Sequence, residues 1–222
     1  PDRFLTAAER KLGWLFGAPG LILWLGMLLY TGIQLMPQWD RFVSAAGQVV
    51  APGSWIRVVF VYALLKVLHE FGHGLATKRF GGSVPECGVQ MLAFITPLAY
   101  VDASSSWKFS SKWKRIVVAA AGMYVEVGIA CFCILGWLNT DPGPLNTSLH
   151  SAVIAATLVT VLFNANPLMR FDGYYILNDL IGIPNLGTKG QQYLKWAGKR
   201  VFLGMSDLPM PPATRQHPVA VP

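Results

Sequence analysis

Four apolar stretches follow one another along the chain and predict four membrane-spanning helices. They cover about residues 19–36, 54–77, 116–138 and 149–165. Each is about long enough to cross the hydrocarbon core of a bilayer as a helix. Tryptophan and tyrosine residues near the ends of the first stretch are typical of membrane interfaces. We therefore expect an all-α polytopic membrane protein.

The segment at residues 83–101 does not fit a fifth span. Its apolar patches at residues 88–94 and 97–101 follow Pro85 and are separated by a break at Pro97. Non-helical backbone at membrane depth must be covered by protein or line a wet cavity. We expect a small β-hairpin or a re-entrant segment here, packed against the helices.

The two ends of the chain differ from its apolar centre. Residues 1–19 mix basic, aromatic and aliphatic side chains, which predicts a helix at the membrane interface, and residues 191–203 form a second amphipathic stretch. From about residue 206 to 222 the sequence is rich in proline, and we expect a disordered tail. The chain does not begin with Met, so we treat residues 1–222 as a single membrane core and a candidate fragment of a longer protein.

Composition favours a membrane protein over a soluble one. Hydrophobic residues make up 53% of the chain and charged residues only 13%, about half the charged fraction of an ordinary soluble domain. The net charge of +7 would suit nucleic acid, but the apolar content makes the lipid bilayer the expected partner, and we expect no nucleic-acid partner. Cys87, Cys131 and Cys133 lack the spacing of a zinc knuckle, and we expect buried thiols.

Basic residues predict the orientation in the membrane. They are concentrated at the start of the chain, in the loop at 78–115 and after the fourth apolar stretch, whereas the loops at 37–53 and 139–148 contain few. The positive-inside rule then places both termini and the 78–115 loop in the cytoplasm.

The second apolar stretch contains His69-Glu70-Phe71-Gly72-His73, an H-E-x-x-H motif. Residues i and i+4 share a helix face, so both imidazoles can bind one Zn²⁺, and Glu70 can reach a water on the metal. Zinc lowers the pKa of such a water to about 7, and a carboxylate can then take its proton. Ionisable groups at bilayer depth are costly and mark functional sites, which favours a metal site over a chance match. Catalytic zinc usually has three protein ligands, so a third must come from elsewhere.

A second motif follows the fourth apolar stretch, in the sequence from Asn166-Pro167 to Asp172-Gly173. Taken alone, an Asp-Gly pair after a helix that ends at Asn-Pro would be a simple turn. Together and in this order, the two motifs resemble the site-2 protease (M50-type) family of intramembrane zinc metalloproteases. The resemblance implies that zinc is the cofactor and that His69, His73 and Asp172 bind it. It further implies that Glu70 is the general base and acid, and that Asn166 helps to hold the substrate strand.

Three segments resemble one bacterial branch of that family, the peptide zinc metalloproteases. They are residues 69–75, 78–82 and 166–177, and the resemblance covers roughly residues 55–200. It implies hydrolysis of a peptide bond in a membrane-associated protein or peptide, at the bacterial inner membrane, with the site toward the cytoplasm. Such proteins often accompany secretion systems, so secretion or membrane-complex partner proteins are expected.

Two ionisable residues lie deep inside their apolar stretches. Lys66 is 12 residues from Lys78 and Glu126 is 11 from Arg115, which places both about 16–18 Å from the same membrane edge. An unpaired charge at that depth is costly, and we predict a buried ion pair between Lys66 and Glu126. Two alternatives stay open: Lys66, four residues before Glu70, tunes that carboxylate, or either charge lines a wet cavity unpaired. Glu126 also departs from the family, since many members have asparagine there.

Two other functions fit parts of the sequence. A catalytically silent membrane scaffold or export-accessory subunit could keep a metal site for stability, but a structural site would not need Glu70. A zinc transporter would need polar ligands along the outer half of the spans, and the first and fourth apolar stretches offer almost none. Zinc-dependent proteolysis is the function that we expect.

Overall fold

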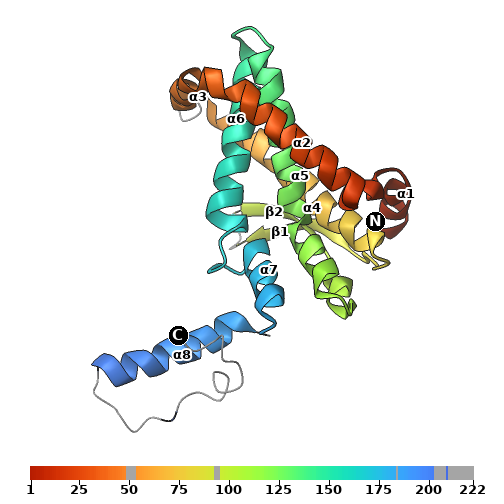
Figure 1. Ribbon diagram of the computed structural model, residues 1–222, viewed down its shortest axis with the longest axis vertical. Coiled ribbons are helices and arrows are strands. Elements are labelled where there is room, and N and C mark those ends of the chain that lie inside the picture. Colours follow the sequence, from red (N-terminus) through yellow and green to blue (C-terminus); the bar gives the residue numbers. More distant parts are fainter. Residues whose placement is uncertain (49–53, 93–95, 184, 203–208, 210–222) are drawn as a thin grey trace.

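The computed structural model describes residues 1–48, 54–92, 96–183, 185–202 and 209. Within them the protein is mostly helical with one two-stranded antiparallel sheet, which confirms the expected fold class. Figure 1 shows the elements along the chain: α1 (Asp2–Leu12), α2 (Ala18–Leu35), α3 (Trp39–Ala45), α4 (Trp55–Arg79), β1 (Cys87–Leu92), β2 (Thr96–Val101), α5 (Lys112–Leu138), α6 (Pro144–Val159), α7 (Asp172–Ile181) and α8 (Leu186–Phe202).

Four helical segments among the described residues are long and apolar enough to cross a membrane. They are Ala18–Ala45, Trp55–Arg79, Lys112–Leu138 and Pro144–Asn164, and they correspond to the four predicted stretches. The first extends beyond its predicted end because a short 3₁₀ turn joins α2 to α3, so part of the expected 37–53 loop is helical. The fourth begins earlier than predicted, at a proline, a residue type that suits the first turn of a helix.

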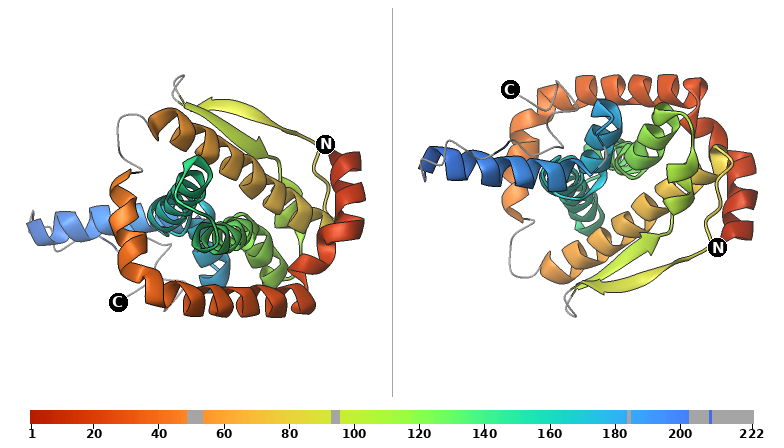
Figure 2. Two further views of the ribbon diagram at one scale, coloured as in Figure 1. Left: turned by 90° about the horizontal axis from the view of Figure 1, so that it is seen from above. Right: turned by 90° about the horizontal axis from the view of Figure 1, so that it is seen from below.

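Helices α4, α5 and α6 pack against one another and form the centre of the molecule. Seen along α5 and α6, helix α2 lies on one side with α1 and α3 at its ends, and α4 lies on the other side with the hairpin (Figure 2). Buried Leu65 of α4 packs against Ala155 and Ala156 of α6. Gly72 brings α4 still closer to α5, because a Cβ there would lie 2.8 Å from the Ala121 carbonyl oxygen. Small residues thus allow the close helix contacts on which the site is built.

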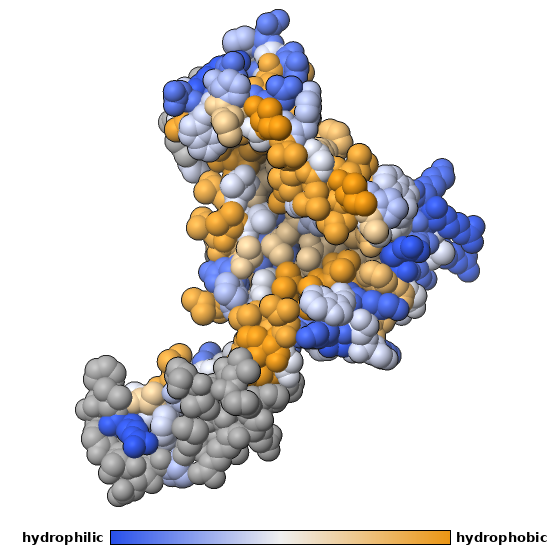
Figure 3. Space-filling model, viewed as in Figure 1, coloured by the Kyte–Doolittle hydropathy of each residue, from blue (hydrophilic) through white to orange (hydrophobic). Residues whose placement is uncertain are grey.

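The outside of the bundle is apolar. Exposed hydrophobic side chains occur on every spanning segment, and examples are Ile22, Ile56, Phe60, Phe132 and Val161. Figure 3 shows hydrophobic residues across the middle of one face, with hydrophilic residues at its top and at the end where α1 lies. Soluble proteins rarely expose contiguous apolar surface on this scale. The protein is therefore a multi-pass membrane protein.

The segment between α4 and α5 forms a β-hairpin rather than a re-entrant loop. Strands β1 and β2 pair antiparallel, with Cys87 opposite Val101 and Leu92 opposite Thr96. Strand β2 lies beside α4. The expectation of a buried thiol is wrong for Cys87, which begins β1 and is exposed, whereas Cys131 is buried, Cys133 is partly buried and all three are free thiols.

The amphipathic stretches at the two ends of the chain form helices α1 and α8. The second was predicted at residues 191–203, and α8 includes it up to residue 202. The proline-rich tail predicted from residue 206 lies, apart from residue 209, outside the described residues.

Helix α1 is attached to the end of α4 through Asp2. The carboxylate lies 2.9 Å from Lys78 Nζ and accepts a hydrogen bond of 2.8 Å from the Val84 N–H. The Val84 hydrogen bond, together with Lys78, holds the pKa of Asp2 below its ordinary value of 3.8.

We expect this attachment to weaken in acid. Because the folded-state pKa of Asp2 is depressed, its stabilising contribution is complete above about pH 3.8 and is lost as the pH falls through the lower folded-state value. Asp2→Asn should lose the contribution already at pH 7, which hydrogen exchange of the α1 amides can measure. Arg10→Gln, at an exposed position on the same helix, is the control. Equal protection of α1 in Asp2→Asn and in the unchanged protein would contradict the prediction.

Candidate metal centre

The two motif histidines share one face of α4, as their spacing predicts. His69 Nε2 and His73 Nε2 lie 3.0 Å apart, and both side chains are buried. Asp172, the first residue of α7, lies beside them, with Oδ2 3.1 Å from His69 Nε2 and Oδ1 3.4 Å from His73 Nε2. One ligand atom from each residue lies within 4.8 Å of the other two. The structure thus brings together three residues that are far apart in the sequence.

The geometry of this set fits zinc. Tetrahedral zinc with ligand bonds of about 2.0–2.2 Å separates its ligand atoms by about 3.3–3.6 Å. The three separations here, 3.0, 3.1 and 3.4 Å, are close to that range, so a small outward movement of the side chains would admit the ion. Asp172 Oδ2 is buried and accepts no hydrogen bond from the described residues, and such an oxygen is costly unless something binds it. Burial opposes ionisation of Asp172, but the neighbouring histidines outweigh it and hold the pKa of the carboxyl below its ordinary value.

The outer nitrogens of both imidazoles have acceptors on α5. His73 Nδ1 lies 2.7 Å from the Val118 carbonyl oxygen, and His69 Nδ1 lies 3.2 Å from Glu126 Oε1. An acceptor at Nδ1 means that Nδ1 carries the proton, which leaves the Nε2 lone pair free for a metal. Both rings therefore turn their metal-binding nitrogen to the same point.

Two glycines make room for the ligands. A Cβ at Gly122 would lie 2.4 Å from His69 Nε2, so only glycine lets this ring lie against α5. A Cβ at Gly173 would lie 2.5 Å from the Ala165 carbonyl oxygen, so Gly173 lets the start of α7 approach the end of the fourth spanning segment. Glycine after Asp172 therefore allows the close approach that places Asp172 beside the two histidines.

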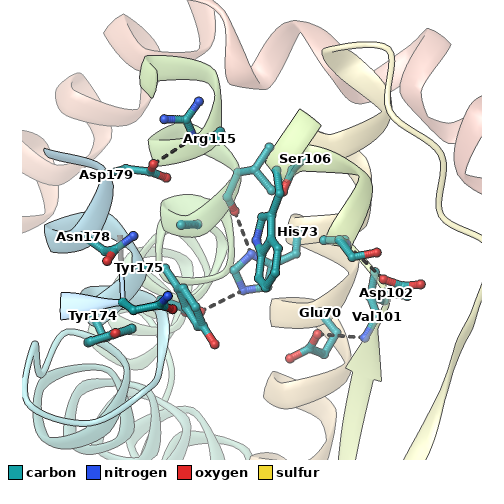
Figure 4. A pocket seen from close by; sticks show the side chains of 17 residues that line it. Glu70, His73, Val101, Asp102, Ser106, Arg115, Tyr174, Tyr175, Asn178 and Asp179 are labelled. Carbon is teal, nitrogen blue, oxygen red and sulfur yellow. Dashed lines mark hydrogen bonds and ion pairs between the residues drawn. The ribbon is translucent and has the colours of Figure 1, made fainter. Parts of the chain in front are cut away.

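Glu70 lies on the wall of a cavity of about 650 Å³ that His73 and Asp172 also line. Its Oε2 accepts a hydrogen bond of 3.0 Å from the N–H of Val101, the last residue of β2. Figure 4 shows His73 and Glu70 projecting from α4 toward this space, with Arg115 and Asp179 paired on the far side. The hairpin thus fixes the carboxylate of the H-E-x-x-H motif beside the candidate metal ligands.

The two asparagines after α6 lie in different environments. Asn166 is partly exposed, and its side chain bonds to its own turn, donating to Leu162 O and accepting from Leu168 N. Asn164 is buried, with Nδ2 3.1 Å from Glu126 Oε2 and 3.5 Å from His69 Nδ1. Asn164 was not predicted from the sequence as part of the site, although it is a polar residue at the end of an apolar helix. The predicted role of Asn166 in holding substrate stays a prediction.

Lys66 and Glu126 lie together between α4 and α5. Lys66 Nζ is 3.0 Å from Glu126 Oε1, and the Glu126 side chain is only 1% exposed. The contact of Glu126 with His69, at 3.2 Å, is a second one and was not predicted from the sequence. Glu126 thus joins the buried lysine to the first histidine of the motif.

Fold and site together define a multi-pass membrane protein with a candidate metallopeptidase centre. Residues 57–157 match the sequence model of peptidase family M50. This segment includes His69, Glu70 and His73 but ends before Asp172, so the assignment of Asp172 depends on the geometry described above.

One curated relative supports the resemblance to peptide zinc metalloproteases. It is the "Putative peptide zinc metalloprotease protein YydH" of Bacillus subtilis (strain 168), which is 26% identical over 125 residues, or 55% of this chain and 47% of the relative. The matched part therefore spans about half the length of that relative. No solved structure matches the chain. The two matches confirm the resemblance to M50-type, site-2 protease-like proteins and support a metallopeptidase.

Proposed function

We propose that this protein is an intramembrane zinc metalloprotease that hydrolyses a peptide bond in a membrane-associated protein or peptide. The observation that carries the proposal is the convergence of His69, His73 and Asp172 on one point, with Glu70 on the wall of the adjoining cavity. A structural metal site would not need that glutamate. The M50 match and the name of the relative support the same reading.

The chain supplies the proton transfers for this chemistry. Zinc, when bound, contributes Lewis acidity and activates water for attack on a peptide carbonyl. Glu70 accepts the proton from the water and delivers it to the leaving amine. The hydrogen bond from Val101 N–H restrains the Glu70 carboxylate, so that its position does not depend on the metal alone.

Substrate reaches the site as an extended segment. A helix hides its carbonyls in i→i−4 hydrogen bonds, so a helical substrate must unwind locally before hydrolysis. The edge of β2 that does not pair with β1 lies next to Glu70, and we assign it the role of holding an unwound segment by strand addition. Asn166, at the turn that leads to Asp172, is the proposed further contact with this segment.

The proposed setting is the bacterial inner membrane, with both termini and the site toward the cytoplasm. Basic residues close α4 and open α5, at the ends of these helices nearer the site, and they support this orientation. We further propose that the protein works with partner proteins of a secretion system or membrane complex.

The metal content of the purified protein tests the proposal. We expect about one zinc per chain, and Asp172→Ala should lose it or bind it much more weakly, because a three-ligand site would keep two ligands. Asp40→Ala, which removes an exposed carboxylate on α3, should keep its zinc. Zinc-free protein after purification with ample metal would refute the proposal and favour a silent scaffold. Full zinc retention in Asp172→Ala would show that the third ligand is another residue.

A further inference from the structure

Glu126 is a buried carboxylate surrounded by polar groups in the middle of an apolar helix. Lys66 Nζ and His69 Nδ1 contact its Oε1 at 3.0 and 3.2 Å. The Thr160 hydroxyl and Asn164 Nδ2 donate to its Oε2, the latter over 3.1 Å. Buried polar groups in such a network hold one another in place. None of these contacts is needed for the proton transfers assigned to Glu70.

The two donors to Oε2 come from one turn of the fourth spanning segment. Residues Thr160–Asn164 form a π-helical turn, which the bond from Ala165 N–H to Thr160 O, at 2.7 Å, continues. Thr160 and Asn164 lie at the two ends of this turn, and both bond to the same carboxylate oxygen. π-Helical turns inside α-helices often occur at functional sites. With Oε2 held in this way, Oε1 is directed to His69.

The contact at Oε1 selects the form of His69 that binds metal. A carboxylate at Nδ1 requires the proton on that nitrogen, and it raises the basicity of Nε2 as a ligand. Gly122 lies four residues before Glu126 on α5 and admits the ring of His69 against the helix. One face of α5 therefore both makes space for the ring and fixes its outer nitrogen. In the corresponding place, among the residues that the structure describes, His73 has a backbone carbonyl and no carboxylate.

We propose that Glu126 is a positioning residue that orients His69 for zinc, with Lys66 as its balancing charge. The proposal rests on the proposed function in one respect, since it assumes that His69 is a zinc ligand. It goes beyond that function by giving a role in metal binding to a residue outside the ligand set.

Zinc affinity of Glu126→Gln is the direct test. Glutamine has nearly the same shape but lacks the charge, and loss of such an outer partner typically weakens metal binding about 10- to 100-fold. Competition with a chromophoric chelator, using the full chain in detergent, measures this change. The visible absorption of the Co²⁺-substituted protein should also change, because His69 is then held less firmly. Asp141→Asn, at an exposed position between α5 and α6, should match the unchanged protein.

A double variant separates positioning from simple stability. Glu126→Gln leaves Lys66 as an unpaired buried charge, which is itself destabilising. The double variant Lys66→Met/Glu126→Gln has no unpaired charge, so the thermal stability of its zinc-free form should be higher than that of Glu126→Gln. Its zinc affinity should stay about 10- to 100-fold below that of the unchanged protein. Zinc affinity that returns to the original value in the double variant, or that is unchanged in Glu126→Gln, would overturn the inference. An unchanged protein that binds no zinc would instead refute the proposed function, and the inference with it.

Discussion

Replacing Glu70 by Gln should abolish peptide hydrolysis while leaving zinc bound. The amide keeps the size of the side chain and can still accept the hydrogen bond from Val101 N–H, but it cannot take a proton from water. Loss of a general base typically lowers a rate by about 10²- to 10⁴-fold. We would reconstitute the protein in vesicles with a mixture of hydrophobic helical peptides, and detect new peptide termini by mass spectrometry beside the zinc content.

The same measurement distinguishes the rival functions. Glu9→Gln makes the same chemical change on α1, away from the cavity, and should cleave as the unchanged protein does. Turnover by Glu70→Gln at the original rate would remove Glu70 from the mechanism. Zinc-loaded protein that cleaves none of the peptides would favour the silent scaffold.

Gly122→Ala should cost nearly all of the zinc affinity. The added Cβ would lie 2.4 Å from His69 Nε2, and the ring cannot retreat easily because Glu126 and Asn164 lie at its outer nitrogen. Overpacking of this kind also destabilises a protein by about 1–3 kcal/mol. Zinc titration and thermal unfolding of the zinc-free protein report the two effects separately.

Helix α5 contains a matched control for this change. At Gly128 a Cβ would lie 3.6 Å from Trp24 Nε1, an ordinary contact. Gly128→Ala should therefore bind zinc normally. Zinc affinity in Gly122→Ala equal to that in Gly128→Ala would show that His69 does not occupy the position described here when metal is bound.

Much of the fold follows from the sequence, because the decisive patterns are local. Apolar length predicts the spanning helices, and the i, i+4 spacing alone puts His69 and His73 on one face of α4. The proline break predicted a hairpin or a re-entrant loop but could not choose between them. Burial of Cys87 was wrongly predicted, since the lack of a zinc or disulfide spacing does not show which strand positions other elements cover.

The surroundings of the candidate ligands were harder to predict for a geometric reason. Depth along a helix follows from counting residues, and it led to the pairing of Lys66 with Glu126. Rotation about the helix axis does not follow from counting, so the contact of Glu126 with His69 was missed. Asn164 was missed because its direction depends on a π-helical turn, and the apolar pattern of α6 gives no sign of that turn.

The free thiol at the start of the hairpin can be used to determine which side of the membrane the hairpin faces. Cys87 is exposed, whereas Cys131 is buried and Cys133 is partly covered. It pairs in register with Val101, whose N–H holds Glu70, so a label there lies close to the candidate site. A membrane-impermeant thiol reagent applied to intact cells, and then to inverted vesicles, distinguishes the two orientations of the bundle without any change to the sequence.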